Sequence, residues 1–359
     1  MKILILGGTG IMGEPLCEKL LRNDYDVHVT SRSYHEKEGV VYHLGNAHDK
    51  LFLESIVVNE KYDVIVDFMS YTTVEFSTVY ELLLNNTSQY IFTSSARVYA
   101  PCDELISESS PRLVDVCGDS EYLSTNEYAL SKARQEDMLI SSGKANWTII
   151  RPSITYGTSR LQYGLGEKEE WLYRYLCNES IIFAKNLESI KTTMSSGVDV
   201  AYAISLLCGN SKALGEVVNI AGANSITWKQ VNEIYSQVLY DRFNRFPEFC
   251  YVEDWSAVSH FLNRYYQMKY ARAVNRQFDN SKLESIVGKV NFSNPDEGLS
   301  NCLNLFLDSD MKFKNVSWKT EAYYNRIAKN NRIPVFPFKE RLKYLVGRYT
   351  PYFDLRNMS

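Results

Sequence analysis

The sequence predicts an α/β fold in which helices cover both faces of a doubly wound parallel sheet. The chain opens with an apolar run, Lys2–Leu6, that leads through a glycine-rich turn into a helical pattern. Extended and helical patterns then alternate to about residue 150, which is typical of parallel strands joined by crossover helices. We expect strands at Lys2–Leu6, Asp26–Thr30, Val40–Leu44, Asp63–Val66, Tyr90–Thr93 and Trp147–Ile150, and helices at about Met12–Arg22, Lys50–Val58, Val74–Leu84 and Tyr122–Ser142.

The turn after the first strand has the spacing of a phosphate-binding loop. Gly7, Gly10 and Gly13 stand three residues apart. Glycine allows a tight turn, lets the backbone approach a pyrophosphate and lets the helix pack close to the strand, and the positive end of the helix dipole then faces the phosphates. An ordinary tight turn between strand and helix is the alternative. Its place after a strand and before a helix favours a dinucleotide site, and with it a Rossmann-type sheet.

The alternation breaks after Arg151 and resumes later in the chain. The stretch to about Lys191 is irregular, aromatic and charged. A helix, a strand and a second helix then follow, and we expect the N-terminal sheet to take back part of this later chain. These three elements are predicted at Val200–Cys208, Glu216–Ile220 and Thr227–Leu239.

Two domains are therefore expected. Residues 1–156 with about 199–240 would form an NAD(P)-binding Rossmann domain. Residues 157–198 with about 241–359 would form a smaller C-terminal α/β substrate-binding domain, which ends in a helical extension over 311–359.

Composition excludes several classes of protein. The chain has 359 residues, 45% of them hydrophobic and 23% charged, and a net charge of −4, so a nucleic acid is not the expected partner. No apolar stretch reaches the roughly 18 residues of a membrane-spanning helix, and the N-terminus lacks a signal pattern. The seven cysteines are scattered without CxxC pairs, which indicates reduced thiols in a cytoplasmic protein. The five histidines lack metal-binding spacing, so no metal site is expected.

The end of the second strand favours NADP(H) over NAD(H). An acidic residue there bonds the ribose 2′-hydroxyl of NAD, whereas arginine accommodates the 2′-phosphate of NADP. Here the strand runs into Ser31, Arg32 and Ser33, without a carboxylate. Two hydroxyls beside a guanidinium suit a phosphate dianion. A solvated loop arginine is the alternative.

Tyr128 and Lys132 form the candidate catalytic pair. Their i, i+4 spacing on a helix places the phenol and the ammonium on one face. Free tyrosine has a pKa of about 10. A nearby cation stabilises the phenolate, so Tyr128 could exchange a proton with a carbinol or carbonyl. Tyr265 and Lys269 have the same spacing, but no serine-bearing strand end precedes them, and we interpret them as a coincidence on a helix face.

A hydroxyl partner is expected at the end of the fifth strand, which supplies Thr93, Ser94 and Ser95. One of these hydroxyls could hold a substrate oxygen against Tyr128. Strand-end turn chemistry is the alternative for the two serines. We favour the first interpretation because sheets of this class place their ligands at the ends of strands.

These motifs together resemble the extended short-chain dehydrogenase/reductases, which include nucleotide-sugar epimerases, dehydratases and reductases. The resemblance covers most of residues 1–310 and is specific for the fold more than for the substrate. It is carried by the turn Gly7–Gly13, by 94–99 (Ser-Ser-Ala-Arg-Val-Tyr), by 128–132 (Tyr-Ala-Leu-Ser-Lys) with Glu136, by 151–157 (Arg-Pro-Ser-Ile-Thr-Tyr-Gly), by 198–201 (Val-Asp-Val-Ala) and by 278–282 (Phe-Asp-Asn-Ser-Lys).

The resemblance implies roles for individual residues. Ser95, Tyr128 and Lys132 would form the catalytic triad, with Tyr128 as acid and base and Lys132 also on the nicotinamide ribose. Arg272 and Arg276 would contact a substrate phosphate, although surface arginines are an equal alternative. The implied cofactor contacts are Gly7, Gly10, Ile11, Met12 and Gly13 for the pyrophosphate, Ser31 and Arg32 for the 2′-phosphate, Asn46 and Ala47 for the adenine, and Phe68, Met69, Thr93 and Pro152 beside the remainder of the cofactor.

Three departures from the family pattern bear on the substrate. The family usually has His-x-Ala-Ala after the fourth strand, where this chain has Asp67-Phe68-Met69-Ser70. Ile154 replaces an asparagine that contacts substrate, which weakens the nucleotide-sugar assignment. Ala96 and Arg97 stand where dehydratases carry an acidic pair, which disfavours dehydration.

The predicted function is an NAD(P)-dependent epimerase or reductase that acts on a nucleotide-activated sugar by hydride transfer. The first alternative is an NADP-dependent reductase of a non-sugar carbonyl, such as a flavonoid- or steroid-like compound. The second is a non-catalytic dinucleotide-sensing or RNA-associated relative, against which the complete Ser–Tyr–Lys set argues. Relatives commonly pair through the helices expected here at Val74–Leu84 and Tyr122–Ser142, which favours a homodimer. The alternative is that the C-terminal extension blocks that surface.

Overall fold

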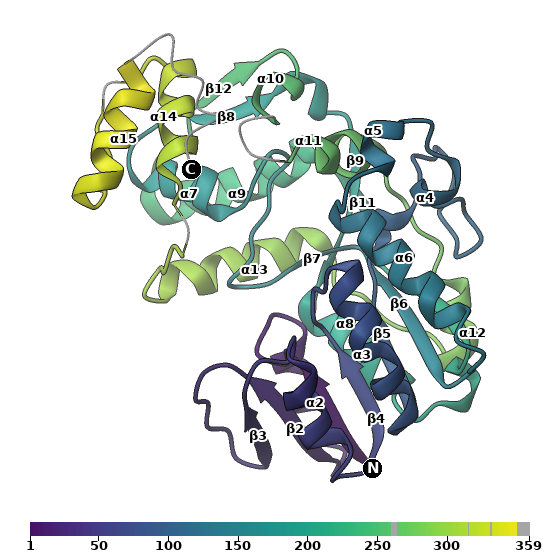
Figure 1. Ribbon diagram of the computed structural model, residues 1–359. Coiled ribbons are helices and arrows are strands. Elements are labelled where there is room, and N and C mark those ends of the chain that lie inside the picture. The colour runs from purple at the N-terminus through teal and green to yellow at the C-terminus, as the bar shows by residue number, and fades with distance from the viewer. Residues whose placement is uncertain (260–263, 315, 331, 350–359) are drawn as a thin grey trace. The chain divides into compact units, whose positions relative to one another are not determined.

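The computed structural model describes residues 1–259, 264–314, 316–330 and 332–349 (Figure 1). The end of the expected C-terminal extension, 350–359, lies outside this part of the chain. The chain divides into two compact units. Unit 1 comprises Met1–Gly157, Thr193–Ser225 and Arg276–Pro295, and unit 2 comprises Thr158–Thr192, Ile226–Asn275 and Asp296–Ser359.

Unit 1 is built on a seven-stranded sheet whose strands are all parallel. The strand order is β10-β6-β5-β4-β1-β2-β3, so the direction of winding reverses between β1 and β4. This is the predicted doubly wound sheet. Its strands are β1 (Lys2–Leu6), β2 (Asp26–Ser31), β3 (Val40–Leu44), β4 (Tyr62–Asp67), β5 (Thr87–Thr93), β6 (Trp147–Pro152) and β10 (Glu216–Ile220).

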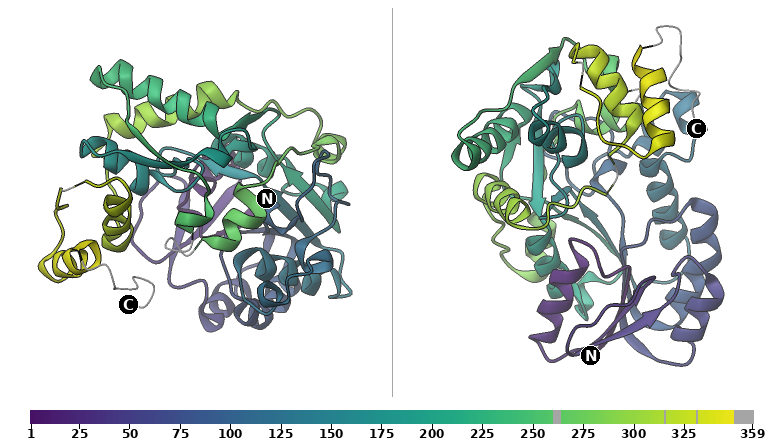
Figure 2. Two further views of the ribbon diagram at one scale, coloured as in Figure 1. Left: turned by 90° about the horizontal axis from the view of Figure 1, so that it is seen from above. Right: turned by 90° about the vertical axis from the view of Figure 1, so that its left-hand side faces the viewer.

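Helices cover both faces of this sheet (Figure 2). Side chains of β1 alternate between the faces: Ile3 and Ile5 join one hydrophobic core, and Leu4 and Leu6 join the other. The first core receives α1 (Gly13–Leu21), α8 (Gly197–Leu207) and α12 (Ser281–Val287). The second receives α2 (Lys50–Val57), α3 (Thr73–Asn85) and α6 (Tyr128–Ile140). Both faces of the strands are buried, which explains their nearly continuous apolar runs.

The long helix expected at Tyr122–Ser142 is two helices. Asp119 caps the short helix α5 (Ser120–Leu123), which ends before Tyr128. A new helix, α6, begins at Tyr128 because the Glu127 carboxylate accepts a hydrogen bond from the Ala129 amide and so caps its first turn. The structure thus places Tyr128 at the N-terminal end of a helix.

The stretch from Arg151 to Lys191, expected to be irregular, contains several short elements. A strand, β7 (Ile154–Tyr156), pairs in parallel with β9 (Lys191–Ser196). A three-stranded sheet with the order β11-β9-β7 includes them, where β11 is Ser225–Thr227. Between β7 and β9 lie α7 (Lys168–Leu176) and β8 (Ile181–Ala184).

The boundaries between the two units differ from those expected at three places, of which the smallest is 193–198, expected in the second domain and observed in unit 1. The helix predicted at Thr227–Leu239, observed as α9 (Trp228–Phe243), lies in unit 2, where the Trp228 indole donates to the Arg272 carbonyl. Residues 276–295, expected in the second domain, lie in unit 1. There Leu283 and Val290 are buried in the core that also contains α1 and α8.

Unit 2 contains α7, α9, the parallel pair β8 and β12 (Phe249–Val252), and most of the C-terminal chain. Its interior holds a charged cluster: the Arg174 guanidinium lies 2.8 Å from a Glu321 carboxylate oxygen and 3.1 Å from Glu179. Arg174 also donates to Asn325 at 2.8 Å, so it connects α7 to the helix α14 (Trp318–Ile327). The remaining helices are α10 (Ser256–Ser259), α11 (Tyr265–Gln267) with a π-helical continuation at Met268–Arg272, α13 (Pro295–Asp308), α14 (Trp318–Ile327) and α15 (Phe338–Tyr349).

A buried histidine, His28, and a half-buried one, His43, make the stability of unit 1 dependent on pH. The His28 and His43 rings stack with centroids 5.1 Å apart, and Nδ1 of His28 lies 2.9 Å from Nε2 of His43. Burial lowers the pKa of both imidazoles, although Asp26 and Glu60 partly oppose this for His28. The unfolded chain binds protons at its histidines near pH ~6.5, whereas the folded chain does so only at lower pH. The free energy of unfolding should therefore fall as the pH drops below about 6.5.

Replacement of His43 by glutamine tests this coupling. The melting temperature of the variant should decline less between pH 7 and pH 5 than that of the parent, because one imidazole with a lowered pKa has been removed. Thermal denaturation followed by circular dichroism at a series of pH values measures the slope. His35→Gln, in the loop after β2, is the matched control and should leave the slope unchanged. Equal slopes for parent and His43→Gln would exclude His43 as the cause.

Candidate active site

The glycine turn joins β1 to α1 through backbone contacts that side chains would block. Gly7 has a φ of +71°, a conformation that favours glycine. A Cβ on Gly13 would lie 2.4 Å from the Gly8 carbonyl oxygen, so the helix can approach the turn only because residue 13 is glycine. A Cβ on Gly10 would meet no atom within 4 Å. The turn thus packs tightly at Gly13 and leaves open space at Gly10.

The start of α8 closes on the same turn. A Cβ on Gly197 would lie 2.3 Å from the Ile11 carbonyl oxygen, so this glycine also allows a close approach. The Gly7 amide donates to the Thr30 hydroxyl at 3.1 Å, which fixes the turn to the end of β2. Backbone and side-chain contacts therefore hold residues 7–13 at the carboxyl edge of the sheet, where folds of this class bind ligands.

The loop after β2 presents Arg32 to solvent. The Ser31 hydroxyl is buried and accepts from the Ser33 amide at 3.2 Å while it donates to the Ser33 carbonyl at 2.8 Å. Ser31 therefore shapes the loop. Arg32 is exposed and makes no ion pair with any described residue, so its guanidinium remains available to an anion.

The other predicted cofactor residues follow the ends of neighbouring strands. After β3, the Asn46 side chain accepts from the His48 amide at 3.2 Å, and Ala47 is buried. After β4, the Phe68 amide donates to the Leu6 carbonyl at 3.0 Å, which holds this segment against the glycine turn. A Cβ on Gly7 would lie 3.0 Å from Met69 Sδ. Pro152, at the end of β6, is buried.

Tyr128 and Lys132 lie on one face of α6, as predicted. The Lys132 ammonium is 6.0 Å from the centre of the Tyr128 ring and 4.5 Å from that of Phe92. Tyr128 is 37% exposed, whereas Lys132 is buried. Burial lowers the pKa of Lys132 to about 8, and the carboxylates of Asp67 and Glu136 oppose this shift. As the first residue of α6, Tyr128 also lies at the positive end of the helix dipole, which stabilises a phenolate.

The three candidate hydroxyls at the end of β5 have different surroundings. Ser94 is buried, and its hydroxyl donates to Glu136 at 2.5 Å. The proton of this hydroxyl is therefore used within the protein interior. Thr93 Oγ1 is also buried and has no hydrogen-bond partner among the described residues. Ser95 is half-buried, and its hydroxyl accepts from the Arg97 amide at 3.2 Å while its proton stays available to a ligand. Ser95 is therefore the serine of this pair that could serve a substrate.

A charged cluster beneath the site holds the strand ends in place. Glu136 is fully buried, and its two carboxylate oxygens accept from Arg151 at 2.9 and 2.6 Å. Arg112 approaches the same carboxylate at 3.3 Å. The Arg151 guanidinium lies 4.7 Å from the centre of the Tyr99 ring. The cluster links α6, β6 and the segment after β5, so it positions Ser95 and Tyr128 relative to one another.

A second ion pair fixes the start of α6 and was not expected from the sequence. Arg97 forms an ion pair with Glu127, the residue that caps α6. The Arg97 guanidinium also lies 5.1 Å from the centre of the Tyr128 ring. The sequence offered one signal for this ion pair: Arg97 stands where dehydratases carry an acidic residue. Glu127 belongs to no motif, so its role could not be predicted.

The two predicted substrate arginines lie in different units. Arg276, in unit 1, is buried and donates to the carbonyls of Ala100 and Tyr99 at 3.3 and 3.0 Å; burial, reinforced by Arg97, lowers its pKa to about 10. Arg272, in unit 2, is buried and donates to Glu167 at 2.9 Å. The sequence does not distinguish these buried contacts from an exposed phosphate site.

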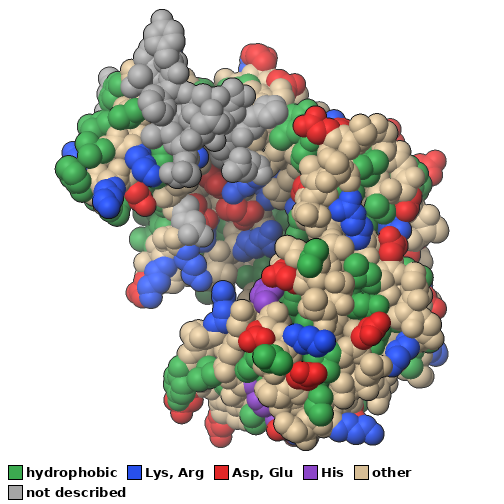
Figure 3. Space-filling model, in the orientation of Figure 1, with side chains coloured by type: hydrophobic (Ala, Val, Ile, Leu, Met, Phe, Trp, Pro, Cys, Tyr) green, Lys and Arg blue, Asp and Glu red, His purple; other side chains and the backbone are tan. Residues whose placement is uncertain are grey.

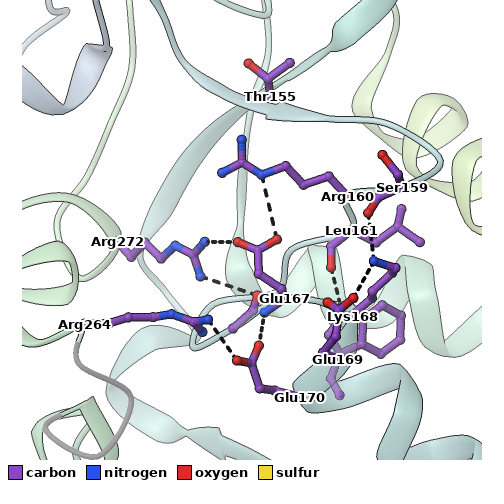
Figure 4. A network of polar contacts seen from close by, with 12 residues as sticks. Thr155, Ser159, Arg160, Leu161, Glu167, Lys168, Glu169, Glu170, Arg264 and Arg272 are labelled. Atoms are coloured by element: carbon purple, nitrogen blue, oxygen red, sulfur yellow. Dashed lines mark hydrogen bonds and ion pairs between the residues drawn. The ribbon is translucent and has the colours of Figure 1, made fainter. Parts of the chain in front are cut away.

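Figure 4 shows the polar network around Arg272. Arg160 reaches the second oxygen of Glu167 at 3.9 Å, and Arg264 pairs with Glu170 at 2.8 Å. Nε of Arg272 is buried and has no hydrogen-bond partner among the described residues. The two acids are thus matched by three arginines, which leaves an excess of positive charge in this part of unit 2.

The pair Tyr265 and Lys269 lies in unit 2 and not on the seven-stranded sheet. Lys269 is 5.8 Å from the centre of the Tyr265 ring. The distance within this pair is therefore similar to that between Tyr128 and Lys132. The glycine turn and Ser95, however, belong to unit 1, together with Tyr128 and Lys132. Within the described residues, no group of histidine, cysteine or acidic side chains could hold a metal ion, and no helix has the length and apolarity needed to span a bilayer.

Two solved structures are similar to this chain in fold. The dTDP-glucose 4,6-dehydratase of Bacillus anthracis, solved with NAD, superimposes with a TM-score of 0.68 at 16% identity and covers 87% of this chain and 98% of its own. The UDP-glucose 4-epimerase of Bifidobacterium longum, solved with NAD+ and UDP, gives a TM-score of 0.65 at 17% identity, with 87% and 100% covered. At these identities the likeness shows the fold.

A sequence relative has a different description. The chloroplast stem-loop binding protein of 41 kDa b, from Arabidopsis thaliana, is 28% identical over 243 residues, which are 63% of this chain and 60% of that protein. The chain thus spans less than two thirds of this relative. The model of the NAD dependent epimerase/dehydratase family matches residues 3–221, more than half of the sequence. The resemblance to the extended short-chain dehydrogenase/reductases is confirmed, and the chain belongs to the NAD dependent epimerase/dehydratase family.

Proposed function

We propose that this protein is an NAD(P)-dependent epimerase or reductase of a nucleotide-activated sugar. The observation that carries the proposal is the Tyr128–Lys132 pair, at the start of a helix that packs on the same sheet as the glycine turn. A purely structural helix start has no need for a buried ammonium beside a partly exposed phenol. The B. anthracis dehydratase and the B. longum epimerase, named above, support the assignment to sugar-nucleotide chemistry.

The residues at the carboxyl edge of the sheet fit a dinucleotide. The open space at Gly10 and the N-terminal turn of α1 suit a pyrophosphate, because backbone amides and the helix dipole favour an anion there. A bound nicotinamide would supply or accept the hydride. The proposed contacts are Gly7, Gly10, Ile11, Met12 and Gly13 for the pyrophosphate, Ser31 and Arg32 for a 2′-phosphate, Asn46 and Ala47 for the adenine, and Phe68, Met69, Thr93, Lys132 and Pro152 for the nicotinamide half.

The step proposed for the chain's own side chains is the transfer of one proton. Tyr128 Oη would take the proton of a substrate hydroxyl during oxidation and return it during reduction. Lys132 would stabilise the phenolate form through its charge. Ser95 would donate its hydroxyl proton to the substrate oxygen and hold that oxygen in reach of Tyr128. Ala96 and Arg97 supply no acid and base for loss of water, so we do not propose dehydration.

Arg32 is proposed to select NADP(H). Replacement by alanine should weaken NADP(H) about tenfold or more, because charge-assisted hydrogen bonds contribute about 1.5–3 kcal/mol each. NAD(H) has no 2′-phosphate and should lose little affinity. Titration of cofactor fluorescence measures both dissociation constants, and Arg22→Ala, at the C-terminal end of α1, is a matched control. Equal losses for the two cofactors would exclude a 2′-phosphate role for Arg32.

Substrate recognition is proposed to involve Ser95, Arg272 and Arg276. Arg272 has the stronger support, because its Nε lacks a partner among the described residues and its neighbours carry excess positive charge. Arg276 is bonded to backbone carbonyls, which favours a role in shaping the segment after β5. A cluster in which arginines outnumber carboxylates would suit a diphosphate.

A thermal-shift screen tests the proposed function. The protein is heated with NADP or NAD and with UDP-, GDP-, dTDP- and CDP-sugars in turn. Stabilisation by a dinucleotide and by one family of sugar nucleotides is the expected result, since a ligand that binds the folded state raises the melting temperature. An epimerase should retain its cofactor through purification, whereas a reductase should release it. Stabilisation by a dinucleotide and by none of the sugar nucleotides would instead favour a non-sugar carbonyl reductase. Ile154 also favours that alternative, because it replaces an asparagine that contacts substrate in the family.

One observation favours an RNA-associated function as the second candidate: the stem-loop binding description of the Arabidopsis relative. The net charge of −4 argues against it, and acidic and basic side chains are interspersed over the face in Figure 3. A gel-shift titration with a structured RNA at two salt concentrations decides the point. Tight, salt-dependent binding would favour RNA association.

We also propose that the protein forms a homodimer through α3 and α6, which contact one another on one face of the sheet. Light scattering should then give twice the mass of one chain.

A further inference from the structure

A buried carboxylate and the proposed catalytic lysine contact the same residue, Met69. Asp67 ends β4 and is fully buried. One of its oxygens accepts from the Met69 amide at 2.8 Å, and the other accepts from the Tyr90 hydroxyl at 2.6 Å. The Lys132 ammonium donates to the Met69 carbonyl at 3.0 Å. A single residue, Met69, is therefore held at its amide by Asp67 and at its carbonyl by Lys132.

The ammonium of Lys132 has few other polar contacts. Among the described residues, it donates to the Met69 carbonyl and lies 4.5 and 6.0 Å from the ring centres of Phe92 and Tyr128. Ring faces attract a cation only weakly, by about 0.5–2 kcal/mol. A fully buried ammonium costs several kcal/mol of desolvation, so an anion is needed nearby to keep it charged.

The titratable groups around Asp67 identify that anion. Burial raises the pKa of the Asp67 carboxyl, and Tyr90 on β5, Lys132 on α6 and Tyr71 after β4 oppose this shift by stabilising its carboxylate. Glu136, one turn beyond Lys132, is the other nearby acid, but both of its oxygens accept from Arg151. Asp67 has no arginine among these neighbours. Its negative charge is therefore the one that remains to match Lys132.

We infer that Asp67 is a positioning residue for catalysis: its carboxylate holds the Met69 segment and keeps Lys132 protonated beside Tyr128. This inference rests on the proposed function. Burial lowers the pKa of Lys132 to about 8, and Asp67 is the largest influence in the opposite direction. Without the carboxylate, Lys132 would lose its proton at a lower pH and would no longer stabilise a phenolate on Tyr128. The Asp67 position is also the one where the chain departs from the His-x-Ala-Ala pattern.

A double-mutant cycle in thermal stability tests the charge pair without any substrate. Asp67→Asn keeps the shape and the Met69 contact while it removes the charge. Lys132→Met alone leaves Asp67 buried without its cation, so the double variant Asp67→Asn/Lys132→Met should melt at a higher temperature than Lys132→Met. If Asp67→Asn lowers the melting temperature equally in both backgrounds, the two groups do not interact and the inference fails.

A titration of phenolate absorbance tests the effect on Tyr128. The ultraviolet difference between a protein and its Tyr128→Phe partner isolates this one phenol. In the Asp67→Asn background, the transition should move to higher pH by about one unit or more, and turnover at neutral pH should fall about tenfold with little change in KM. Glu321→Gln, which neutralises a buried carboxylate beside Arg174 in unit 2, is the matched control and should leave the transition unmoved.

The outcomes separate this inference from the proposed function. Neither the stability cycle nor the titration needs a substrate, so they decide the role of Asp67 even if no sugar nucleotide is turned over. An unmoved Tyr128 transition in folded Asp67→Asn would overturn the inference. If Asp67→Asn does not fold, the comparison of Lys132→Met with Lys132→Arg replaces it: arginine restores the cation and should recover the melting temperature, and failure of that rescue would equally overturn it.

Discussion

Tyr128→Phe should lower turnover by about 10²–10⁴-fold, the usual contribution of a positioned general acid or base, while the affinity for the dinucleotide stays nearly intact. The variant loses one oxygen and keeps the ring, which lies within 5.1 Å of Arg97 and 6.0 Å of Lys132. These cation contacts are made to the ring and persist, so the start of α6 should keep its structure. Steady-state kinetics on the substrate found by the ligand screen, with cofactor titration, measures both quantities.

The chain supplies its own control for this experiment. Tyr265 has the same spacing to Lys269, and the two lie on a helical segment of unit 2. Tyr265→Phe should leave turnover within about twofold of the parent, because its phenol does not belong to the proposed Ser95, Tyr128 and Lys132 triad. Unchanged turnover in Tyr128→Phe would remove its phenol from the mechanism. A similar loss in both variants would mean that the tyrosines act through stability.

The sequence predicted the sheet because its signals are local. Each strand of unit 1 is an apolar run bounded by turn residues, and β1, β3 and β10 were predicted with their observed bounds. The glycines of the first turn have separate structural reasons: Gly7 has a positive φ, Gly13 allows a close approach to Gly8, and Gly10 leaves open space. The spacing of Tyr128 and Lys132 likewise depends only on helix geometry.

The parts that were not predicted depend on contacts distant in sequence. The break before Tyr128 is made by the Glu127 cap, whose second partner, Arg97, is 30 residues away. Residues 276–295 pack into unit 1 because Leu283 fits a core built from the first helix and the eighth, and no local pattern encodes that choice. Ser94 and Ser95 look equivalent in sequence. Only the buried Glu136 separates them, because it engages Ser94.

Gly10→Ala should weaken dinucleotide binding about tenfold or more without a change in melting temperature. An added Cβ at residue 10 meets no protein atom within 4 Å, so the folded chain accommodates it. The same open space is where we place the pyrophosphate, and a methyl group there would separate the phosphates from the backbone amides that bind them. Cofactor titration and thermal denaturation of the free protein measure the two effects separately. Full affinity in Gly10→Ala would place the pyrophosphate elsewhere.

Gly13→Ala provides the contrast, because its added Cβ would lie 2.4 Å from the Gly8 carbonyl oxygen. Backbone cannot move aside as a flexible side chain can, so α1 must shift away from the turn. Overpacking of this kind costs about 1–3 kcal/mol or more. Gly13→Ala should therefore lower the melting temperature of the free protein as well as the affinity for the cofactor. The two glycines then separate the functions of one motif: residue 13 lets the helix reach the strand, and residue 10 lets the ligand reach the backbone.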